Sequence, residues 1–256
     1  MDPDKNRVAA VILAAGMGTR MKSSKAKVLH EIGGRPMITY VVQTAQRIAG
    51  DNIVLVVGHQ ADTVKSVVSQ NADVAYALQA EQLGTGHAVR CALPQIPSGT
   101  KEVLILYGDV PLLRAETIKM LVHEHRTNKN HVTVLAVEMA DPTGYGRILC
   151  DAKGRFCKIV EQADASAEQK KIKLINTGIY CVQKHFLTKA LSQIKADNNQ
   201  KEFYLTDIIG LGYAGAKKIG FVVGQESDET TGVNTLDDLA QVESILNKYQ
   251  KQGNRK

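Results

Sequence analysis

The sequence lacks several features that would place it at a membrane or outside the cell. No apolar run approaches the roughly 18 residues that cross a bilayer, and the N-terminus, MDPDKNR, has no apolar core of a signal peptide. The four cysteines show neither a CxxC pair nor zinc-ligand spacing. We therefore expect a cytoplasmic protein with reduced thiols and no membrane partner.

Aromatic residues are also scarce, which bears on the basic charge of the chain. They make up 5% of the sequence and tryptophan is absent, so a stacking platform for single-stranded nucleic acid is not expected. The net charge of +6 is dispersed, and part of it lies in a tail, residues 251–256, that we expect to be frayed. We predict no nucleic-acid partner and favour a small substrate rich in phosphate.

Apolar runs and helical patterns alternate along the first half of the chain. Strands are predicted over residues 8–15, 52–58, 73–79, 102–109 and 131–139, and helices over residues 36–49, 62–70 and 115–128 and from 84–86 onward. Continuously apolar strands that alternate with helices are typical of a parallel sheet covered on both faces. We therefore expect an α/β fold with a Rossmann-like, mixed, mostly parallel sheet and helices on both faces.

The pattern changes after residue 140, where glycine-containing turns separate short strand-like runs and indicate hairpins. The later elements are a strand over 176–182, helices over 185–194 and 204–217, a strand over 218–224 and a helix over 234–250. We expect one domain with an inserted β-rich lobe and see no internal repeat.

The stretch VILAAGMGTRM, residues 11–21, joins a predicted strand to a turn with two glycines. Open α/β sheets bind ligands at the carboxyl ends of their strands, where backbone amides hold phosphates. Met21 stands where a third glycine of GxGxxG would be, and no GK[ST] follows, so a standard dinucleotide site or P-loop is disfavoured. The cations after the turn are Arg20, Lys22, Lys25 and Lys27. They suit a triphosphate, and a plain turn with a solvated basic loop is the alternative.

Three other polar positions lie at the ends of predicted elements. Asp109 ends a strand, where it could hold Mg²⁺ or simply form a turn. Gln79 also ends a strand, and its amide can donate and accept at once, as a uracil edge requires, although it could be only a strand-terminal polar residue. Asn234 could lend its oxygen to a metal, or Asn234 or Thr235 could cap the last helix, because Thr235 and Asp238 resemble a capping box.

The histidines offer little evidence of a site. His123 and His125 are two apart on a predicted helix and face different ways, so we expect them at the surface rather than at a metal. His87 follows the second glycine turn and could lie near a ligand. No Ser/His/Asp or Cys/His nucleophile arrangement is visible.

Taken in chain order, the motifs together resemble a known family. They are LAAGMGTRM, KVLH, QAEQLGTGHA, LYGDVPL, DPTGYGRI, INTGIY, FYLTDII and GVN. The chain closely resembles the sugar-nucleotidyltransferases, and within them the uridylyltransferase (pyrophosphorylase) half of bacterial N-acetylglucosamine-1-phosphate uridylyltransferases. LAAGxGTRM marks the wider family, whereas QAEQLGTGHA with DPTGYGRI is specific to the N-acetylglucosamine enzymes.

This resemblance covers roughly residues 6–250 and implies the nucleotide-diphospho-sugar transferase fold. We expect a single nucleotidyltransferase domain over residues 1–250. Its parts would be a nucleotide-binding part over about 6–139, a sugar-binding lobe over about 140–225 and a C-terminal helix over 234–250.

The resemblance also implies a reaction, in which UTP and N-acetylglucosamine 1-phosphate give UDP-N-acetylglucosamine and pyrophosphate, with Mg²⁺ as cofactor and no covalent intermediate. The nucleotide-binding positions would be Leu13, Ala14, Ala15, Gly16, Gly18, Thr19, Lys27, Gln79, Gly84 and Thr85. The sugar-binding positions would be Tyr107, Gly108, Gly146, Glu161, Asn176, Thr206 and Asn234. The catalytic residues would be Arg20, Lys27 and Asp109, with Asp109 and Asn234 as metal ligands.

Two departures from the family pattern matter. The family usually has proline before the lysine of KVLH, and this chain has Ala26, which we expect to loosen the loop. The chain also ends at Lys256 without the hexapeptide repeats of a left-handed β-helix. We therefore expect no acetyltransferase domain and no trimer driven by one, and a separate acetyltransferase is a candidate supplier of the sugar phosphate.

Two other functions stay open at this point. One is uridylyl or thymidylyl transfer to another sugar 1-phosphate, such as glucose 1-phosphate. The other is a non-catalytic regulator that binds a nucleotide sugar, which would be expected to lack the metal-binding or cationic positions.

Overall fold

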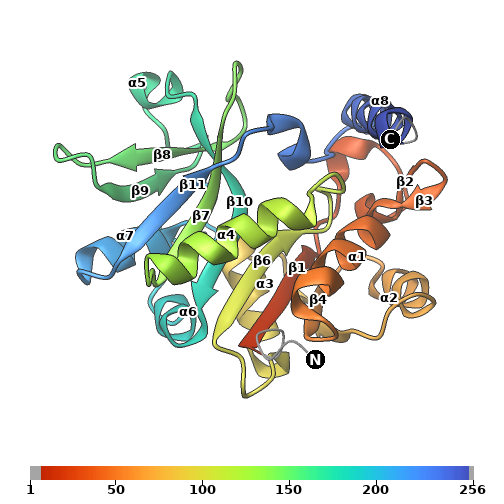
Figure 1. The fold of residues 1–256 in the computed structure, drawn as a ribbon, viewed down its shortest axis with the longest axis horizontal. Helices are drawn as coiled ribbons and strands as arrows, with labels where there is room; N and C mark the ends of the chain where they lie inside the picture. The colour runs from red at the N-terminus through yellow and green to blue at the C-terminus, as the bar shows by residue number, and fades with distance from the viewer. Residues whose placement is uncertain (1–6, 254–256) are drawn as a thin grey trace.

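A mixed β-sheet runs through the structure, a computed structural model that describes residues 7–253 (Figure 1). From one edge to the other its main strands are β11 (Ile219–Val223), β7 (Val132–Glu138), β10 (Leu174–Gln183), β6 (Glu102–Tyr107), β1 (Val8–Ala14), β4 (Ile53–Val57) and β5 (Ala75–Leu78). Neighbouring strands β6, β1, β4 and β5 pair in parallel, as do β11 and β7, whereas β10 runs antiparallel to both its neighbours. The prediction of a mixed, mostly parallel sheet is confirmed.

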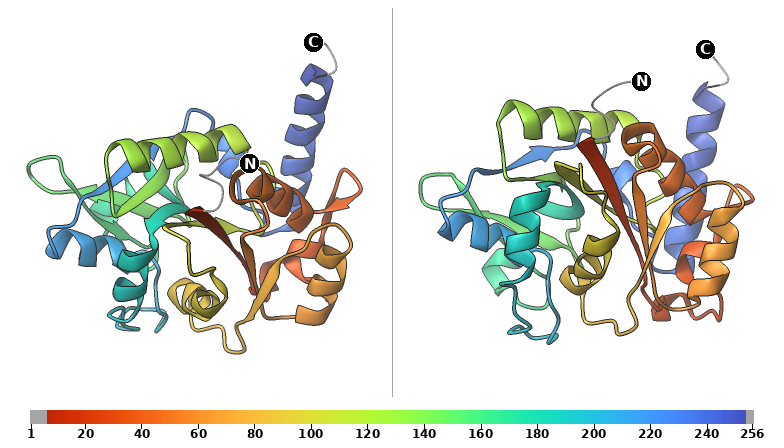
Figure 2. Two further views of the ribbon diagram at one scale, coloured as in Figure 1. Left: turned by 60° about the horizontal axis from the view of Figure 1, so that its bottom comes forward. Right: turned by 90° about the horizontal axis from the view of Figure 1, so that it is seen from below.

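Every residue of β1 and β4 is buried, which explains why their sequences are continuously apolar. Alternate residues of β1 enter two different cores. Ala9, Val11 and Leu13 pack with helices α3 (Thr85–Ala92), α6 (Lys184–Leu191) and α7 (Asp207–Ala214). Val8, Ala10, Ile12 and Ala14 pack with helices α1 (Met37–Ala49), α2 (Ala61–Ser69) and α4 (Ala115–Thr127). Figure 2 shows α4 and α3 on opposite sides of the sheet.

The β-rich part after residue 140 extends the sheet at one end. Strand β8 (Gly146–Cys150) pairs with β10 and with β9 (Phe156–Val160), and the turn between β8 and β9 includes Gly154 with a positive φ. A short helix α5 (Ala167–Lys170) follows, with a capping box formed by Ser166 and Gln169. The hairpin expected from the glycine-containing turns is therefore present.

Helix α8 (Leu236–Gly253) packs away from the main sheet, against the small hairpin of β2 (Glu31–Ile32) and β3 (Arg35–Pro36). Its Val242 and Ile245 form a third apolar cluster with Met21, Ile32, Met37, Leu112 and Val233. Helix α8 extends to Gly253, so residues 251–253 of the tail that we expect to be frayed are helical. Residues 254–256 of the expected tail lie outside the described residues.

None of the helices within residues 7–253 combines the length and the hydropathy that a membrane span requires.

The expectation that both histidines of α4 lie at the surface is wrong for His125. His123 is exposed. His125, two residues later, lies on the opposite side of the helix, which faces the sheet, and only 2% of this residue is exposed. Its Nδ1 lies 2.9 Å from Thr133 Oγ1, and Thr133 also accepts a hydrogen bond from Asn130. Burial lowers the pKa of His125 to about 4.

This shift makes stability depend on pH. The unfolded chain binds a proton at His125 below about pH 6.5, whereas the folded protein binds it only near pH 4. Acid therefore favours unfolding between these values. We expect the unfolding free energy, measured with urea, to fall between pH 7 and pH 4 by on the order of 3 kcal/mol more in wild type than in His125→Phe.

His123→Phe is the matched control, since this exposed residue lies on the same helix. Its pH dependence should equal that of wild type. Equal slopes for wild type and His125→Phe would contradict the assignment of this acid sensitivity to His125.

Candidate active site

Two adjoining clefts lie at the carboxyl ends of the central strands. The first, about 330 Å³, is floored by residues that follow β1 and flanked by the start of α3. The second, about 260 Å³, lies between the end of β6 and the β-rich part. The residues that line both clefts, and therefore mark their boundary, are Thr85, Tyr107, Asp109, Glu202 and Asn234.

The two glycines after β1 have different roles in the turn. A Cβ at Gly16 would meet nothing within 4 Å, and Gly16 lines the first cleft. Gly18 has φ +64°, and a Cβ there would lie 2.7 Å from Lys27 Cβ. Met21 is buried in the third apolar cluster, so a side chain anchors the turn where a dinucleotide motif would have its third glycine. Gly18 thus lets Lys27 approach while Gly16 leaves the floor open.

Lys27 joins residues that are far apart in the sequence. Its Nζ contacts Asp109 Oδ2 and lies 3.1 Å from Asn234 Oδ1, which also accepts a hydrogen bond from Arg20 Nη2 at 2.9 Å. The side chains of Lys27 and Asp109 are 16% and 13% exposed, so water screens this pair only weakly. One carboxylate oxygen and one amide oxygen therefore converge on a single ammonium group.

The loop that carries Lys27 is held in a way that its sequence did not indicate. Ala26 N donates to Gln60 Oε1 at 2.8 Å, and Gln60 Nε2 donates to Ser24 O. Ala26 has φ −53° and ψ 134°, angles that proline also adopts. A proline has no N–H and could not make the bond to Gln60. Gln60 therefore holds the loop where the family usually has proline, and the loosening expected from Ala26 stays a prediction.

The two alternatives for the start of α8 are resolved by neighbouring residues. Thr235 Oγ1 accepts from Asp238 N at 3.1 Å, and Asp238 Oδ2 accepts from the backbone amides of Thr235 and Asn234. Thr235 and Asp238 therefore form the capping box. The side chain of Asn234 takes no part in this cap and lines the clefts. Val233 N donates to Asp109 O at 2.9 Å, which joins the two segments directly.

A magnesium ion would fit this oxygen pair only with help from a ligand. Within residues 7–253 no group of three or more His, Cys, Asp or Glu side chains could hold a metal. Asp109 and Asn234 supply two hard oxygens that already converge on a cation. Mg²⁺ is commonly held by one or two carboxylates together with substrate phosphates, so this donor set suits it if phosphates complete the coordination.

The second cleft contains a half-buried carboxyl group. Thr206 Oγ1 donates to Glu161 Oε1 at 3.0 Å, and burial raises the pKa of Glu161. A Cβ at Gly146 would lie 2.9 Å from Ile159 and 3.2 Å from Glu161, so glycine leaves room for the carboxylate. Glu161 therefore already accepts a hydroxyl hydrogen bond and can accept another from a ligand in the cleft.

A bulge in β10 shapes the floor of the same cleft. The register of β10 shifts between Asn176 and Tyr180, and Asn176 Oδ1 accepts from Gly178 N at 3.0 Å. Gly178 has φ +82°, and a Cβ there would lie 2.5 Å from Tyr107 Cε2. Bulges commonly redirect a side chain next to a functional site, and here Tyr107 and Asn176, which both line this cleft, each contact Gly178 or its Cβ position.

Gln79 has a fixed orientation in the first cleft. It is 4% exposed, and its Nε2 donates to Gly84 O at 3.1 Å and lies 3.2 Å from His87 Nδ1. Within residues 7–253 the amide oxygen has no such partner, so this oxygen is the group left for a ligand. Gly84, with φ +102°, is pressed against Glu202 and Phe203 and begins α3.

Most predicted site residues line the clefts. Those in the first are Leu13, Ala14, Ala15, Gly16, Arg20, Lys27, Gln79, Gly84 and Thr85, and those in the second include Tyr107, Asp109, Gly146, Glu161, Asn176, Thr206 and Asn234. Gly18, Thr19 and Gly108 line neither. Gly108 instead packs against α1, where a Cβ would lie 2.9 Å from Ile38.

Several other lining residues were not predicted from the sequence, among them Gln82, Tyr145, Gln200, Glu202 and Tyr204. Gln82 and Tyr145 lie inside the motifs QAEQLGTGH and TGYG and could have been found there. The others belong to the polar stretch 195–205, which has no periodicity to indicate that it folds over the site.

Comparisons with known proteins identify relatives of this chain. Residues 10–175 match the MobA-like NTP transferase domain. The bifunctional protein GlmU of Geotalea uraniireducens is 47% identical over 242 residues, 94% of this chain and 53% of that protein. The bifunctional protein GlmU of Desulfotalea psychrophila is 42% identical over 242 residues, 94% of this chain and 71% of that protein. The chain spans about half the length of the first curated relatives.

A solved structure described as a glucose-1-phosphate thymidylyltransferase from Bacillus anthracis has the same fold. The TM-score is 0.71 over 93% of this chain and 94% of that chain, at 19% sequence identity. This likeness concerns the fold alone.

The bulge in β10 generates a test of the second cleft. Alanine at Gly178 must adopt a positive φ and must also displace Tyr107. We expect Gly178→Ala to lower the unfolding free energy, measured with urea, by about 2–4 kcal/mol. Gly154→Ala is the matched control, since φ is +74° there and nothing lies within 4 Å, and it should lose only about 1 kcal/mol. Equal losses would show that Tyr107 is not confined by Gly178.

Proposed function

The chain belongs to the MobA-like NTP transferase family and, within it, to the group of proteins named bifunctional protein GlmU, and from that premise we propose that it transfers a uridylyl group from UTP to N-acetylglucosamine 1-phosphate. The products are UDP-N-acetylglucosamine and pyrophosphate.

The observation that carries this proposal is the convergence of Lys27, Asp109 and Asn234 where the two clefts meet. A reaction between two phosphorylated substrates needs both of them at one point, with their negative charge neutralised there. A cation-binding oxygen pair and an ammonium group at the boundary of a nucleotide-sized and a sugar-sized space meet that need. A regulator that only binds nucleotide sugars has no requirement for this cluster.

We assign the nucleotide to the first cleft. The main chain from Leu13 to Gly16 lies under the triphosphate, with Arg20 and Lys27 as its cationic partners. Gln79 accepts from uracil N3–H through its amide oxygen, since its nitrogen already donates to Gly84 O. Thr85 and Gly84 complete the contact with the base and ribose.

We assign the amino sugar to the second cleft. Glu161, Asn176 and Thr206 provide hydrogen-bond partners for the sugar hydroxyls and the acetamido group. The floor beneath them is the bulge of β10, and Gly146 leaves the room that the sugar ring requires beside Glu161. These side chains fix the direction in which the sugar phosphate faces the nucleotide.

The chemistry then consists of alignment and charge neutralisation. The phosphate of the sugar is already a competent nucleophile, so no residue need form a covalent intermediate or remove a hydroxyl proton. Lys27 exchanges its contacts with Asp109 and Asn234 for contacts with the phosphates, and Arg20 neutralises the leaving pyrophosphate. Asp109 and Asn234 would hold Mg²⁺, which when bound neutralises the phosphate oxygens of both substrates.

The first test is pyrophosphate release from UTP and N-acetylglucosamine 1-phosphate. We expect turnover by wild type, and a loss of at least about a hundredfold in Asp109→Asn and in Lys27→Ala, because each removes a charge that acts on the reacting phosphates. Glucose 1-phosphate and glucosamine 1-phosphate are run in parallel, and N-acetylglucosamine 1-phosphate should have the highest kcat/KM.

The exposed Lys22, in the same turn but absent from both clefts, provides the control. Lys22→Ala should keep near-normal turnover. Near-normal turnover of Asp109→Asn at saturating Mg²⁺ would remove Asp109 from the metal role, and no turnover by wild type with any sugar phosphate would refute the proposed function.

A second test concerns the base. Because the amide oxygen of Gln79 faces the ligand, it pairs with the N3–H of uracil but meets the bare N3 of cytosine. We expect Gln79→Ala to lower the ratio of kcat/KM for UTP over CTP by at least about tenfold, while inhibition by pyrophosphate stays unchanged. The exposed Gln70→Ala serves as the control. An unchanged UTP/CTP ratio would contradict the uracil role.

A further inference from the structure

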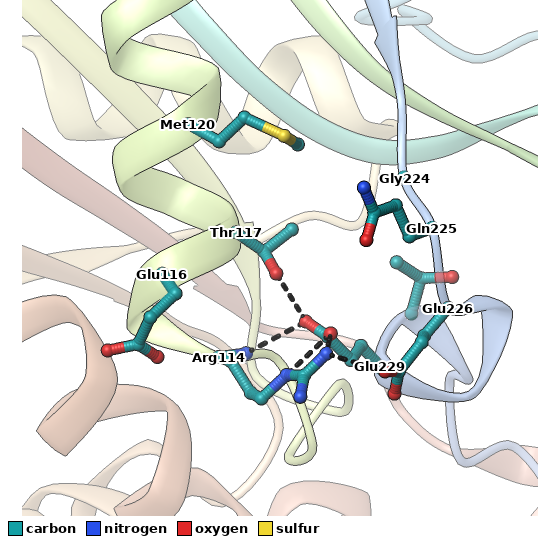
Figure 3. Close-up of a pocket in the computed structure, with 9 residues that line it drawn as sticks. Arg114, Glu116, Thr117, Met120, Gly224, Gln225, Glu226 and Glu229 are labelled. Carbon is teal, nitrogen blue, oxygen red and sulfur yellow. Dashed lines mark hydrogen bonds and ion pairs between the residues drawn. The ribbon is translucent and has the colours of Figure 1, made fainter.

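An ion pair outside both clefts joins the two segments that carry Asp109 and Asn234. Arg114 lies five positions after Asp109, at the start of α4, and Glu229 lies five positions before Asn234. Arg114 Nε donates to Glu229 Oε1 at 2.6 Å, and Arg114 Nη2 contacts the same oxygen and also pairs with Glu226 Oε1 at 3.2 Å. Figure 3 shows this pair beside a cavity of about 290 Å³.

Glu229 also closes the N-terminus of α4. Its Oε2 accepts from Arg114 N at 3.3 Å and from Thr117 Oγ1 at 2.5 Å. Arg114 is the N-cap residue, and its own side chain does not cap the helix. A carboxylate from a distant segment thus takes the place of a capping side chain, where the helix dipole favours negative charge. Only 2% of Glu229 is exposed, so its charge depends on these partners.

The two segments are therefore connected at both ends. Near the clefts, Val233 N donates to Asp109 O at 2.9 Å. At the far end, Arg114 and Glu229 hold them. Leu112, which lies between these connections, is buried in the same apolar cluster as Val233. The separation of the Asp109 and Asn234 side chains is consequently set by these connections, of which the ion pair is the one farthest from the clefts.

We propose that Arg114 and Glu229 are positioning residues that set the spacing of Asp109 and Asn234 for a divalent cation. This inference rests on the proposed function for its catalytic consequence, but the spacing itself is a property of this chain. Neither Arg114 nor Glu229 lines either of the two clefts of the candidate active site, so the pair acts through the two segments that it joins. Residues that orient metal ligands commonly change metal affinity or activity by about 10–100-fold when removed.

The test uses the full chain with Mn²⁺ as the probe and inorganic phosphate at a fixed, saturating concentration to complete the coordination, and Mn²⁺ binding is followed by water-proton relaxation. We expect Arg114→Met to bind Mn²⁺ about tenfold more weakly than wild type, at the lower end of the range for such residues. Asp109→Asn, which removes a proposed metal ligand, shows the Mn²⁺ affinity that remains when the metal site is lost. Arg126→Met is the matched control, because Arg126 pairs with Glu102 and joins the opposite ends of α4 and β6. It should bind Mn²⁺ like wild type.

A double-mutant cycle separates positioning from general destabilisation. Arg114→Met should lower kcat about tenfold in the wild-type background and less than about twofold in Asp109→Asn. KM for UTP should stay within about twofold in both backgrounds. Arg114→Lys keeps the charge and should recover most of the Mn²⁺ affinity. If Arg114→Met does not fold, Glu229→Gln, which removes the other charge of the pair, replaces it in the cycle with the same expected loss.

Normal Mn²⁺ binding by Arg114→Met, a loss equal to that of Arg126→Met, or additive effects in the cycle would each overturn the inference. A failure of the proposed function is distinguishable from these results. In that case wild type would release no pyrophosphate, while the comparison of Mn²⁺ affinities, which requires no turnover, would still decide the role of the ion pair.

Discussion

The site depends on one interaction, the ammonium group of Lys27 between the oxygens of Asp109 and Asn234. The three residues come from the start of the short 3-10 helix Lys27–Leu29, the turn after β6 and the segment before α8, so the contact joins parts of the chain that are 82 to 207 positions apart. Positive and negative groups held together in a poorly hydrated cleft are mutually stabilised, but they are also ready to exchange partners when a charged ligand arrives. A triphosphate offers Lys27 such a partner.

Each of the three segments is anchored by apolar packing directly beside its polar residue. Val28 and Leu29 follow Lys27 into the core under α1, Val110 follows Asp109 into the same core, and Val233 precedes Asn234 in the cluster under α8. The positions of the polar atoms are therefore fixed by the adjacent buried apolar residues, which cannot move without exposing apolar surface. This arrangement lets short loops hold a precise geometry without secondary structure of their own.

Much of the fold could be predicted from the sequence, because buried parallel strands are continuously apolar and helices have clear amphipathic patterns. The predicted helices and strands over residues 8–138 begin and end within one or two residues of the observed positions, but the short strands β2 and β3 in this range were not predicted. The antiparallel direction of β10 and the bulge at Gly178 were not predicted, since the direction of a strand depends on its tertiary neighbours. His125 was misplaced because the apolar face of α4 includes one histidine, and only the structure reveals its partner Thr133.

The site was predicted unevenly for a similar reason. Motifs mark residues that adjoin glycines or strand ends, and Asp109, Gln79 and the turn at 13–16 are of this kind. Glu202 and Tyr204 come from a polar loop whose place over the cleft is fixed by close packing of Gly84 and Gly86 against residues 202–204. That contact is long-range, and nothing in the loop itself indicates it.

Ala26 illustrates how a departure from a family pattern can be compensated elsewhere in a chain. A proline restricts a loop by reducing the freedom of the unfolded state. Ala26 cannot do so, but its N–H donates a hydrogen bond that proline could not make. Gln60 accepts this bond from Ala26 N and donates another to Ser24 O. Gln60 itself adopts a left-handed conformation, φ +53°, at the start of α2. Holding the loop therefore requires an unfavourable backbone conformation at the start of a neighbouring helix. Since Lys27 follows Ala26 directly, the position of the ammonium group on which the site depends is set in this protein by a glutamine far away in the sequence.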